Sequence, residues 1–515
     1  MKRRTAACPS CAAPIEFKVG TSLVTVCEFC QSAIARVDRK VEDHGKVADL
    51  IETNSPLRRG LTGKFGRKQF SIFGRVQYAH PAGGTWNEWY LAFPGGKWGW
   101  LAESQGKLYL MFQRQLSSSI RLPDYEALEV GKVVRLGKSE FTVTEKGSAT
   151  AATAEGDIPW NFRPGAKHVF ADLSGPDGTF ATFEYGDRPA AYVGKEVSLE
   201  SLQLDGLAQV YEESKIIVPA VQLNCPQCAG PLLLHAPDST ERVTCQNCNS
   251  MLDASNGKLE YFATLKNQEK LPILILLGSQ GTLFGDDYLV IGFLRRFALY
   301  EGSTYPWSEY LLYNQNIGYR WLIHNDGHWA FAEPAPGHLT RSGNSVQYDG
   351  DNFAVYDRGT AYVRSVMGEF YWRVEVGETV RTSDYIAPPR MLSFEWSETG
   401  DSEEMNVTLG TYLLHEDVEQ AFGVTDLRRP WSVGVIQPRP DVGFGVFGLW
   451  LVFIALIVVI HVAFSKPGST VGSDPWMMFY AILFVSLIPV GILAYFYSFE
   501  AKRWQDSDYS PYASE

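Results

Sequence analysis

Eight cysteines stand in two copies of one four-cysteine pattern, and no cysteine is left over. The first copy is Cys8-Pro-Ser-Cys11 with Cys27-Glu-Phe-Cys30, and the second is Cys225-Pro-Gln-Cys228 with Cys245-Gln-Asn-Cys248. The pairs within a copy are separated by 15 and 16 residues, the spacing of a four-thiolate zinc ribbon. Because protein thiolates fill all four tetrahedral positions, we expect two structural zinc ions.

Disulfides and redox-active cysteine pairs are the alternatives to zinc. Disulfides need an oxidising compartment, whereas the membrane topology below places these cysteines in a reducing one. A catalytic dithiol does not require two further cysteines at ribbon spacing. Pro9 and Pro226 stiffen the first turn of each cluster by fixing φ. Loss of one ligand, as in Cys8→Ser, is expected to unfold the first ribbon locally.

The cysteine clusters belong to a longer internal repeat. Cys8 and Cys225 are offset by 217 residues, and Trp86-Asn-Glu88-Trp89 matches Trp307-Ser-Glu309-Tyr310 at an offset of 221. Later positions, such as Asp172 and Asp384, match at 212. The offset changes in loop-like stretches, where insertions are tolerated. Residues 1 to about 205 and about 222 to 425 are therefore two copies of one unit, a ribbon followed by a larger domain.

The larger domains are predicted to be all-β. Short runs of aromatic and β-branched residues recur between turn signals such as Asn325-Asp326-Gly327. Helical periodicity is confined to about 45–52 and 416–421. The predicted fold is mainly β, with two tandem units of a zinc ribbon and a β-sheet or barrel, followed by a two-helix transmembrane hairpin. The expected boundaries are 1–40 and 222–262 for the ribbons, 55–205 and 270–425 for the β-domains, and 443–464 and 476–499 for the helices.

Two uncharged apolar runs lie near the end of the sequence. They cover 443–464 and 476–499, 22 and 24 residues, which at 1.5 Å per residue is enough to span a hydrocarbon core of about 30 Å. Arginines precede the first run and Lys502 and Arg503 follow the second. The positive-inside bias therefore predicts two passes with both termini in the cytoplasm. We expect an anchor in the lipid bilayer of a bacterial inner membrane.

The charge balance restricts the partners. A formal net charge of −12 opposes nucleic-acid binding by the chain as a whole. The first unit nevertheless carries a basic cluster that the second lacks: Arg58, Arg59, Lys64, Arg67 and Lys68. This cluster is either a contact for anionic lipid or nucleic acid, or a solvated surface.

The sequence contains no nucleotide-binding loop, nucleophile elbow or metalloprotease helix. Glu88 and Glu309, acids shared by the two units, are candidates for general bases or ligand anchors, with structural hydrogen bonding as the alternative. His324-Asn-Asp-Gly-His328 has the spacing of a metal pair, but the first unit does not share it and Asp-Gly indicates a turn. His461 is an ionisable residue inside the first apolar run, and its role stays open.

Both larger domains resemble the bacterial family called domain of unknown function 4178. The resemblance rests on 86–91 and 307–312, on the Gly-x-x-x-Trp patterns ending at Trp160 and Trp372, and on the run 384–395. The first unit departs from the pattern at 172–184, where it lacks the Pro388-Pro389 step. The resemblance carries over no catalytic residue. It implies a cell-envelope role beside membrane-stress and membrane-organising proteins.

Together these features predict a non-enzymatic, membrane-anchored cytoplasmic scaffold that recruits membrane-associated proteins. Duplicated binding-type modules can add avidity without new contacts. Two alternatives remain open. One is an enzyme with a cleft in the β-domains near Glu88 and Glu309. The other is nucleic-acid binding through the first ribbon and the basic cluster.

Overall fold

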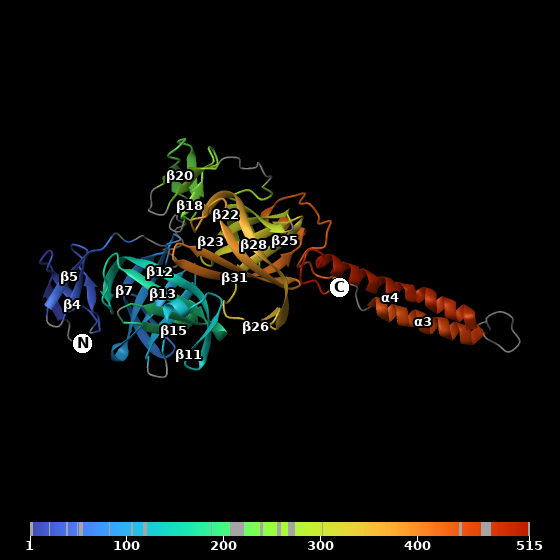
Figure 1. The fold of residues 1–515 in the computed structure, drawn as a ribbon, viewed down its shortest axis with the longest axis horizontal. Helices are drawn as coiled ribbons and strands as arrows, with labels where there is room; N and C mark the ends of the chain where they lie inside the picture. Colours follow the sequence, from blue (N-terminus) through green and yellow to red (C-terminus); the bar gives the residue numbers. More distant parts are fainter. Residues whose placement is uncertain are drawn as a thin grey trace.

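The computed structural model describes the chain except for residues 1–3, 20, 38–39, 49, 51–54, 82, 105–106, 117–120, 187, 206–220, 237–239, 255–258, 266–272, 301, 442–444, 465–474 and 513–515. Within this part the fold is mainly β, as predicted, with two β-units in tandem and two long helices after them (Figure 1). Short 3-10 turns cover Pro94–Gly96, Tyr125–Ala127, Pro176–Gly178 and Glu200–Leu202.

The first larger domain is a closed antiparallel barrel, which we name barrel 1. Among the described residues, eight strands follow one another around it: β7 (Lys68–Ala79), β8 (Thr85–Phe93), β9 (Lys97–Ser104), β10 (Lys107–Arg114), β15 (Ala190–Val197), β14 (Thr179–Tyr185), β13 (Lys167–Ser174) and β12 (Ser139–Ile158), which pairs back onto β7. Two short strands, β6 (Thr62–Phe65) and β11 (Val133–Leu136), form hairpins with β7 and β12. Closure leaves no open sheet edge on these eight strands.

The second larger domain, barrel 2, repeats this order. Its described strands are β22 (Asp286–Tyr300), β23 (Ser303–Asn314), β24 (Gly318–Asn325), β25 (His328–Pro334), β31 (Ser402–Leu413), β30 (Arg390–Thr399), β29 (Thr379–Ala387) and β28 (Asp351–Phe370), which closes onto β22. β21 (Gln280–Leu283), β26 (Thr340–Ser342) and β27 (Ser345–Tyr348) extend its hairpins. The repeat inferred from sequence is therefore a repeat of topology.

Each ribbon contributes five short strands. The first has β1 (Arg4–Ala7), β2 (Pro14–Phe17), β3 (Val24–Val26), β4 (Ser32–Val37) and β5 (Lys40–Lys46), and the second has β16 (Val221–Asn224), β17 (Pro231–Leu234), β18 (Arg242–Thr244), β19 (Ser250–Asp253) and β20 (Glu260–Thr264). β3 pairs with β12, and β18 pairs with β28. One strand of each ribbon is therefore paired with a strand of its own barrel.

The two predicted helical stretches have different outcomes. α2 (His415–Phe422) confirms the stretch near 416–421 and packs on β21 and β25. The helix predicted at about 45–52 is wrong in its described part, because Gly45 and Lys46 end the strand β5 and Lys46 pairs with Ser32 of β4. Residues 49 and 51–54 lie outside the described part. Pairing with a neighbouring strand overrides the weak local helical propensity there.

The interior of barrel 1 follows from strand alternation. One face of every strand must point inward in a closed barrel. Tyr78, Tyr90, Trp100, Met111 and Tyr192, from five strands, form one buried cluster on this inward face. The opposite faces are covered by separate clusters that include Leu57 with Leu202, and Leu128 with Leu136.

The two barrels are joined by a short strand pairing. Glu145 and Lys146 of β12 pair with Glu404 and Glu403 of β31. Close to this pairing, the Ser148 hydroxyl donates to Asp401 at 2.9 Å. The ladder makes the barrels direct neighbours in space.

α3 (Gly445–Phe464) and α4 (Pro475–Arg503) lie side by side and project away from the barrels (Figure 1). The segment Trp476–Arg503, 28 residues, is long and apolar enough to cross a membrane. The apolar part of α3, Phe447–Ala463, is shorter. The structure thus confirms one candidate span, and the predicted connecting loop lies outside the described residues. Large apolar side chains cover the surface of α4; Phe484, for example, is 74% exposed.

Candidate metal centres and barrel interiors

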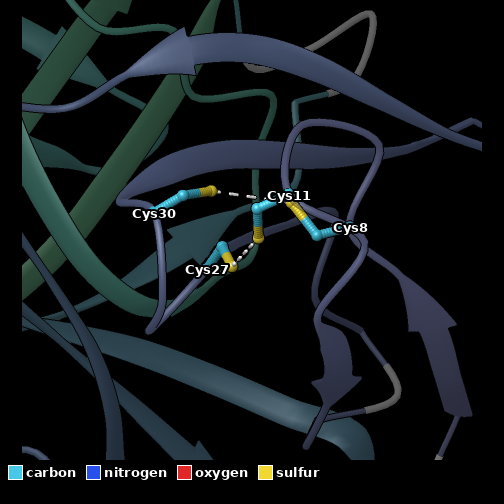
Figure 2. Close-up of side chains that lie close together, drawn as sticks. All are labelled: Cys8, Cys11, Cys27 and Cys30. Atoms are coloured by element: carbon cyan, nitrogen blue, oxygen red, sulfur yellow. Dashed lines mark hydrogen bonds between the residues drawn. The ribbon is translucent and has the colours of Figure 1, made fainter.

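The eight cysteines come together as the two predicted groups of four. Within each group the sulfur atoms lie within 4.8 Å of one another. In the first ribbon, the Sγ atoms of Cys8 and Cys30 are 3.7 Å apart, as are those of Cys11 and Cys27 (Figure 2). In the second ribbon the corresponding pairs, Cys225 with Cys248 and Cys228 with Cys245, are also 3.7 Å apart.

These distances discriminate between the chemical alternatives. A disulfide requires sulfur atoms about 2.05 Å apart. Four sulfurs held about 2.3 Å from one ion in a tetrahedron lie about 3.8 Å from each other. The donor set and its spacing therefore fit two tetrahedral metal ions and do not fit disulfides. Because all four donors are protein thiolates, such an ion would have a structural role.

Each cysteine pair is carried on a tight turn that is built the same way in both ribbons. The Ala12 amide donates to the Cys8 carbonyl at 2.8 Å, and the Ala229 amide donates to the Cys225 carbonyl at 2.8 Å. Ala12 and Ala229 adopt left-handed φ values of 62° and 57°. This turn geometry directs both sulfurs of a Cys-x-x-Cys pair toward one point.

A serine two residues after the last cysteine supports both clusters. Ser32 Oγ lies 3.5 Å from Cys30 Sγ, and Ser250 Oγ lies 3.2 Å from Cys248 Sγ. Hydrogen bonding by these serines lowers the pKa of both Cys30 and Cys248 to about 6. The thiolate is the form that binds metal. The two serines therefore favour the thiolate form of Cys30 and Cys248.

A buried carboxylate fastens each ribbon to its barrel. Asp157 of β12 accepts hydrogen bonds from the Val19 amide at 3.0 Å, the Ser22 hydroxyl at 3.0 Å and the Thr25 hydroxyl at 2.9 Å. At the matching position of β28, Glu369 accepts from the His235 amide at 2.8 Å, the Ala236 amide at 3.1 Å and the Thr240 hydroxyl at 3.2 Å. Both acids are almost fully buried. We call these contacts the ribbon latches.

The first ribbon latch gives a testable prediction. Asp157→Ala leaves three buried donors without an acceptor, at a cost of about 1–3 kcal/mol for each unsatisfied group. We expect amide exchange in residues 19–26 to accelerate at least tenfold, measured by hydrogen–deuterium exchange. Glu140→Ala removes an exposed carboxylate from the same strand and is the control. Unchanged protection in Asp157→Ala would show that the β3–β12 ladder alone holds the ribbon.

Inside barrel 2, the predicted site residue Glu309 forms an ion pair. The Arg296 guanidinium donates to Glu309 at 3.1 Å and to Glu395 at 2.9 Å, and Arg296 is 7% exposed. Trp307 Nε1 donates to Glu309 Oε1 at 2.6 Å. A third acid on this face, Asp384, accepts from the Ser393 hydroxyl. The structure thus gives Glu309 a charge partner inside the barrel.

Barrel 1 keeps the acids but not the arginine. Glu88, Asp172 and Glu184 occupy the positions of Glu309, Asp384 and Glu395 in the repeat. Tyr78 pairs with Trp86 across the strands, and Arg296 pairs with Trp307 in the same way. Tyr78 therefore takes the position of Arg296. Burial raises the pKa of Glu88 well above its ordinary range, and the nearby Glu184 raises it further. Burial also raises the pKa of Glu184 to about 7 and that of Asp172 to about 8.

The raised pKa values predict how stability changes with pH. An unfolded glutamate loses its proton near pH 4.3, about its ordinary pKa, whereas folded Glu184 keeps it to about pH 7. Between these values the folded state binds more protons than the unfolded state, so stability falls as pH rises. We expect this loss of stability between about pH 5 and about pH 8 to be smaller in Glu184→Gln than in the wild type. The midpoint of urea unfolding at each pH measures it. Glu196→Gln, on neighbouring β15, is the exposed control; equal slopes in wild type and Glu184→Gln would contradict the prediction.

The remaining sequence candidates have simpler surroundings. Arg58, Lys64, Arg67 and Lys68 are exposed around the β6–β7 hairpin, while Arg59 pairs with Glu28 at 3.0 Å. His324 accepts a hydrogen bond from the Gly327 amide at 3.2 Å within a turn, and His328 Nδ1 lies 3.0 Å from the Tyr412 hydroxyl. These two histidines are not brought together with further metal donors in the described residues. His461 lies in α3.

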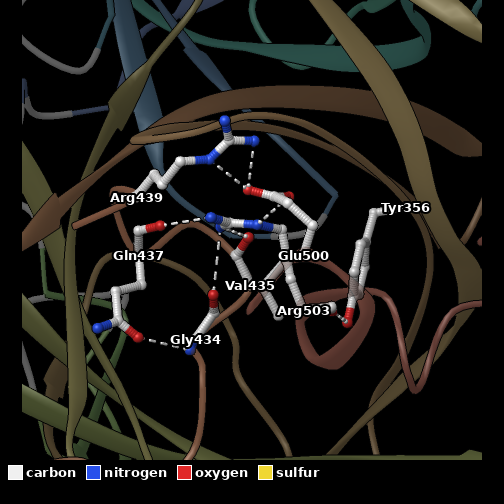
Figure 3. A network of polar contacts seen from close by, with 7 residues as sticks. All are labelled: Tyr356, Gly434, Val435, Gln437, Arg439, Glu500 and Arg503. Carbon is white, nitrogen blue, oxygen red and sulfur yellow. Dashed lines mark hydrogen bonds and ion pairs between the residues drawn. The ribbon is translucent and has the colours of Figure 1, made fainter. Parts of the chain in front are cut away.

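The end of α4 is held by the buried Arg503, whose guanidinium binds the segment 434–437 and whose carbonyl is bound by barrel 2 (Figure 3). The Arg503 guanidinium donates to the carbonyls of Val435 and Gln437, both at 2.7 Å, and pairs with Glu500 at 3.0 Å. The Tyr356 hydroxyl, from β28, donates to the Arg503 carbonyl at 3.0 Å. We call this group the helix latch. It connects the candidate membrane helix to the second barrel through several hydrogen bonds.

The sequence reasoning missed both kinds of latch and the Arg296 ion pair. Asp157 and Glu369 each follow a glycine that the two units share, Gly156 and Gly368. An acid at the same position of both units is the one sequence signal for the ribbon latches. From the sequence, Arg503 indicates only a charge that orients the helix. Tyr78 in place of Arg296 becomes visible once the strand register is known.

The fold and its cysteine groups define a class: a protein of two tandem barrels, each carrying a four-cysteine ribbon, with an apolar helix attached to the second barrel. The family model described as Domain of unknown function (DUF4178) matches residues 58–199 and 276–415. These ranges cover both barrels and more than half of the chain, so the chain belongs to this family, in two copies. The search of curated proteins and the search of solved structures gave no match.

Proposed function

We propose that this protein is a non-enzymatic scaffold anchored in a bacterial inner membrane, whose two zinc ribbons and two barrels recruit membrane-associated proteins on the cytoplasmic side. α3 is 20 residues long, about 30 Å at 1.5 Å per residue, so both helices can cross the bilayer. Both termini then lie in the cytoplasm, where reduced cysteines hold the two zinc ions.

The helix latch is the observation that carries this proposal. A flexible tether would hold a soluble domain near a membrane without fixing its orientation. Here the Tyr356 hydrogen bond attaches the last turn of α4 to barrel 2, and the buried Arg503 guanidinium binds the segment 434–437. Strand pairing then connects barrel 2 to barrel 1, and each barrel to its ribbon. These connections fix the orientation of the barrels and ribbons relative to the membrane, so every membrane-associated partner meets the same surfaces.

The first ribbon offers a specific surface for recruitment. Phe29 stands between Cys27 and Cys30 on the second cysteine turn and is 71% exposed. A large apolar side chain on a turn held by metal is a rigid anchor of the kind that contributes strongly at protein interfaces. The corresponding residue of the second ribbon is Asn247, so the two ribbons present different surfaces.

Crosslinking in native membranes tests the proposal. The full-length protein would be crosslinked, purified with its zinc and compared by mass spectrometry with Phe29→Asp. We expect a defined set of membrane-associated proteins with the wild type and loss of part of that set with Phe29→Asp. Asn247→Asp is the matched control on the other ribbon. Recovery of the bait alone, in crosslinked membranes that contain properly folded protein, would overturn the scaffold role.

A further inference from the structure

The two barrel interiors differ in one decisive residue. In barrel 2, the Nη1 atom of the Arg296 guanidinium contacts both Glu309, at 3.1 Å, and Glu395, at 2.9 Å. Its guanidinium carbon also lies 5.7 Å from the centre of the Trp307 ring. Barrel 1 retains the tryptophan and both glutamates, but Tyr78 stands in place of the arginine and stacks on Trp86 at 5.2 Å. The side chains that hold the guanidinium are therefore duplicated, whereas the guanidinium is not; the basic residue beside Trp86 in barrel 1 is His80, which pairs with Glu145 at 2.9 Å.

Barrel 1 also contains buried polar atoms that lack partners. Within the described part of the chain, Glu88 Oε2, Tyr90 Oη, Trp100 Nε1 and Trp160 Nε1 are buried and make no hydrogen bond. Glu88 is 7% exposed. The three aromatic residues contact one another, with the Tyr90 and Trp160 rings 4.4 Å apart and the Trp100 and Trp160 rings 6.0 Å apart. A buried carboxylate oxygen without a donor is costly, and a bound donor would offset that cost.

We propose that the interior of barrel 1 is a binding site for a guanidinium group, carried by a small molecule or by an arginine side chain of a partner, with Glu88 and Glu184 as its carboxyl ligands and Trp86 as its aromatic wall. The site does not depend on the scaffold role proposed above. Barrel 2 is the internal precedent, because there the equivalent residues already hold a guanidinium.

The chemistry favours guanidinium over other cations. Its planar fork offers five donors, which suits two carboxylates at different angles better than a single ammonium does. It also stacks on aromatic faces. A closed barrel of eight strands encloses just enough room for side chains or for one small ligand. Asp172, Glu184 and Trp86 are half-buried, whereas Glu88 is buried.

Calorimetric titration of the full-length, zinc-loaded protein in detergent tests the proposal. The probes are methylguanidinium, methylammonium and N-acetyl-arginine-methylamide. We expect one methylguanidinium per chain and weaker binding of methylammonium. Tighter binding of the arginine derivative than of methylguanidinium assigns the natural ligand to an arginine side chain, and the reverse order assigns it to a free guanidino compound.

Variants at matched positions locate the site. Glu88→Gln should weaken methylguanidinium binding roughly thirtyfold or more, because it removes a buried charge partner. Glu309→Gln, the same change in barrel 2, should leave binding at barrel 1 unchanged. Tyr78→Arg places a guanidinium within the chain and should abolish binding. Arg296→Tyr should raise the stoichiometry from one to two.

Three results would overturn the proposal. They are the absence of methylguanidinium binding to the wild type, equal affinity for methylammonium, and unchanged affinity in a folded Tyr78→Arg protein. Circular dichroism and zinc content establish that each variant is folded. If Glu88→Gln does not fold, Tyr78→Arg decides the question, because it adds the charge partner that barrel 2 already has.

Discussion

Cys8→Ser is expected to reduce the zinc content from two ions to one per chain and to unfold the first ribbon. The four sulfurs of that ribbon fit one tetrahedral ion, and Cys8 and Cys27 lie in a small buried cluster with Ile15, Phe17 and Ile34. Zinc binding supplies on the order of 10 kcal/mol or more to modules of this kind. Zinc released on denaturation, measured with a chromogenic chelator, gives the stoichiometry. Hydrogen–deuterium exchange in residues 4–37 reports the unfolding.

Matched variants separate this effect from a general loss of folding. Cys225→Ser should remove the second ion and expose the second ribbon while the first stays protected. Ser10→Ala changes an exposed residue between two ligands and should keep both ions. Two zinc ions in purified Cys8→Ser would contradict a four-thiolate site in the first ribbon.

Arg503→Ala is expected to release the end of α4 from the segment 434–437. The guanidinium is 1% exposed, and its removal leaves the carbonyls of Val435 and Gln437 without their donor and Glu500 without its buried partner. Removing one partner of a buried ion pair costs about 3–5 kcal/mol. We expect amide exchange in residues 434–437 and 504–510 to accelerate roughly hundredfold, since each tenfold corresponds to about 1.4 kcal/mol.

Arg439 provides the control for the helix latch. It pairs with the same Glu500 at 3.1 Å but is 54% exposed, so Arg439→Ala should cost less than about 1 kcal/mol. Similar exchange in the two variants would show that charge near Glu500, and not the buried carbonyl contacts, holds the helix. Protection unchanged in both would mean that Tyr356 and the apolar contacts of Trp504 are sufficient.

Local signals in the sequence predicted the elements that depend on spacing and repetition. The cysteine spacing identified two groups of four, and the repeated aromatic motifs predicted two β-units of one family. The apolar run near the end predicted the long helix α4. These features depend on residues close together in the chain, and a single sequence records such spacing directly.

Features that depend on distant pairing were not predictable in the same way. Closure of each barrel requires β12 to meet β7 and β10 to meet β15, and nothing local specifies these pairings. The roles of Asp157, Arg296 and Arg503 follow from those pairings. Each side chain is an ordinary charged residue in the sequence and acquires its role only when a segment far away in the chain is placed against it.

The ladder between the barrels has a consequence for symmetry. It joins β12 to β31, and in the repeat β12 corresponds to β28 while β31 corresponds to β15. A two-fold axis would require β28 to pair with β15, but the described part of β28 pairs with β18, β22, β27 and β29. The contact is therefore heterologous, and the two copies are oriented differently. A two-fold symmetric dimer therefore cannot bind both barrels of one chain through equivalent contacts.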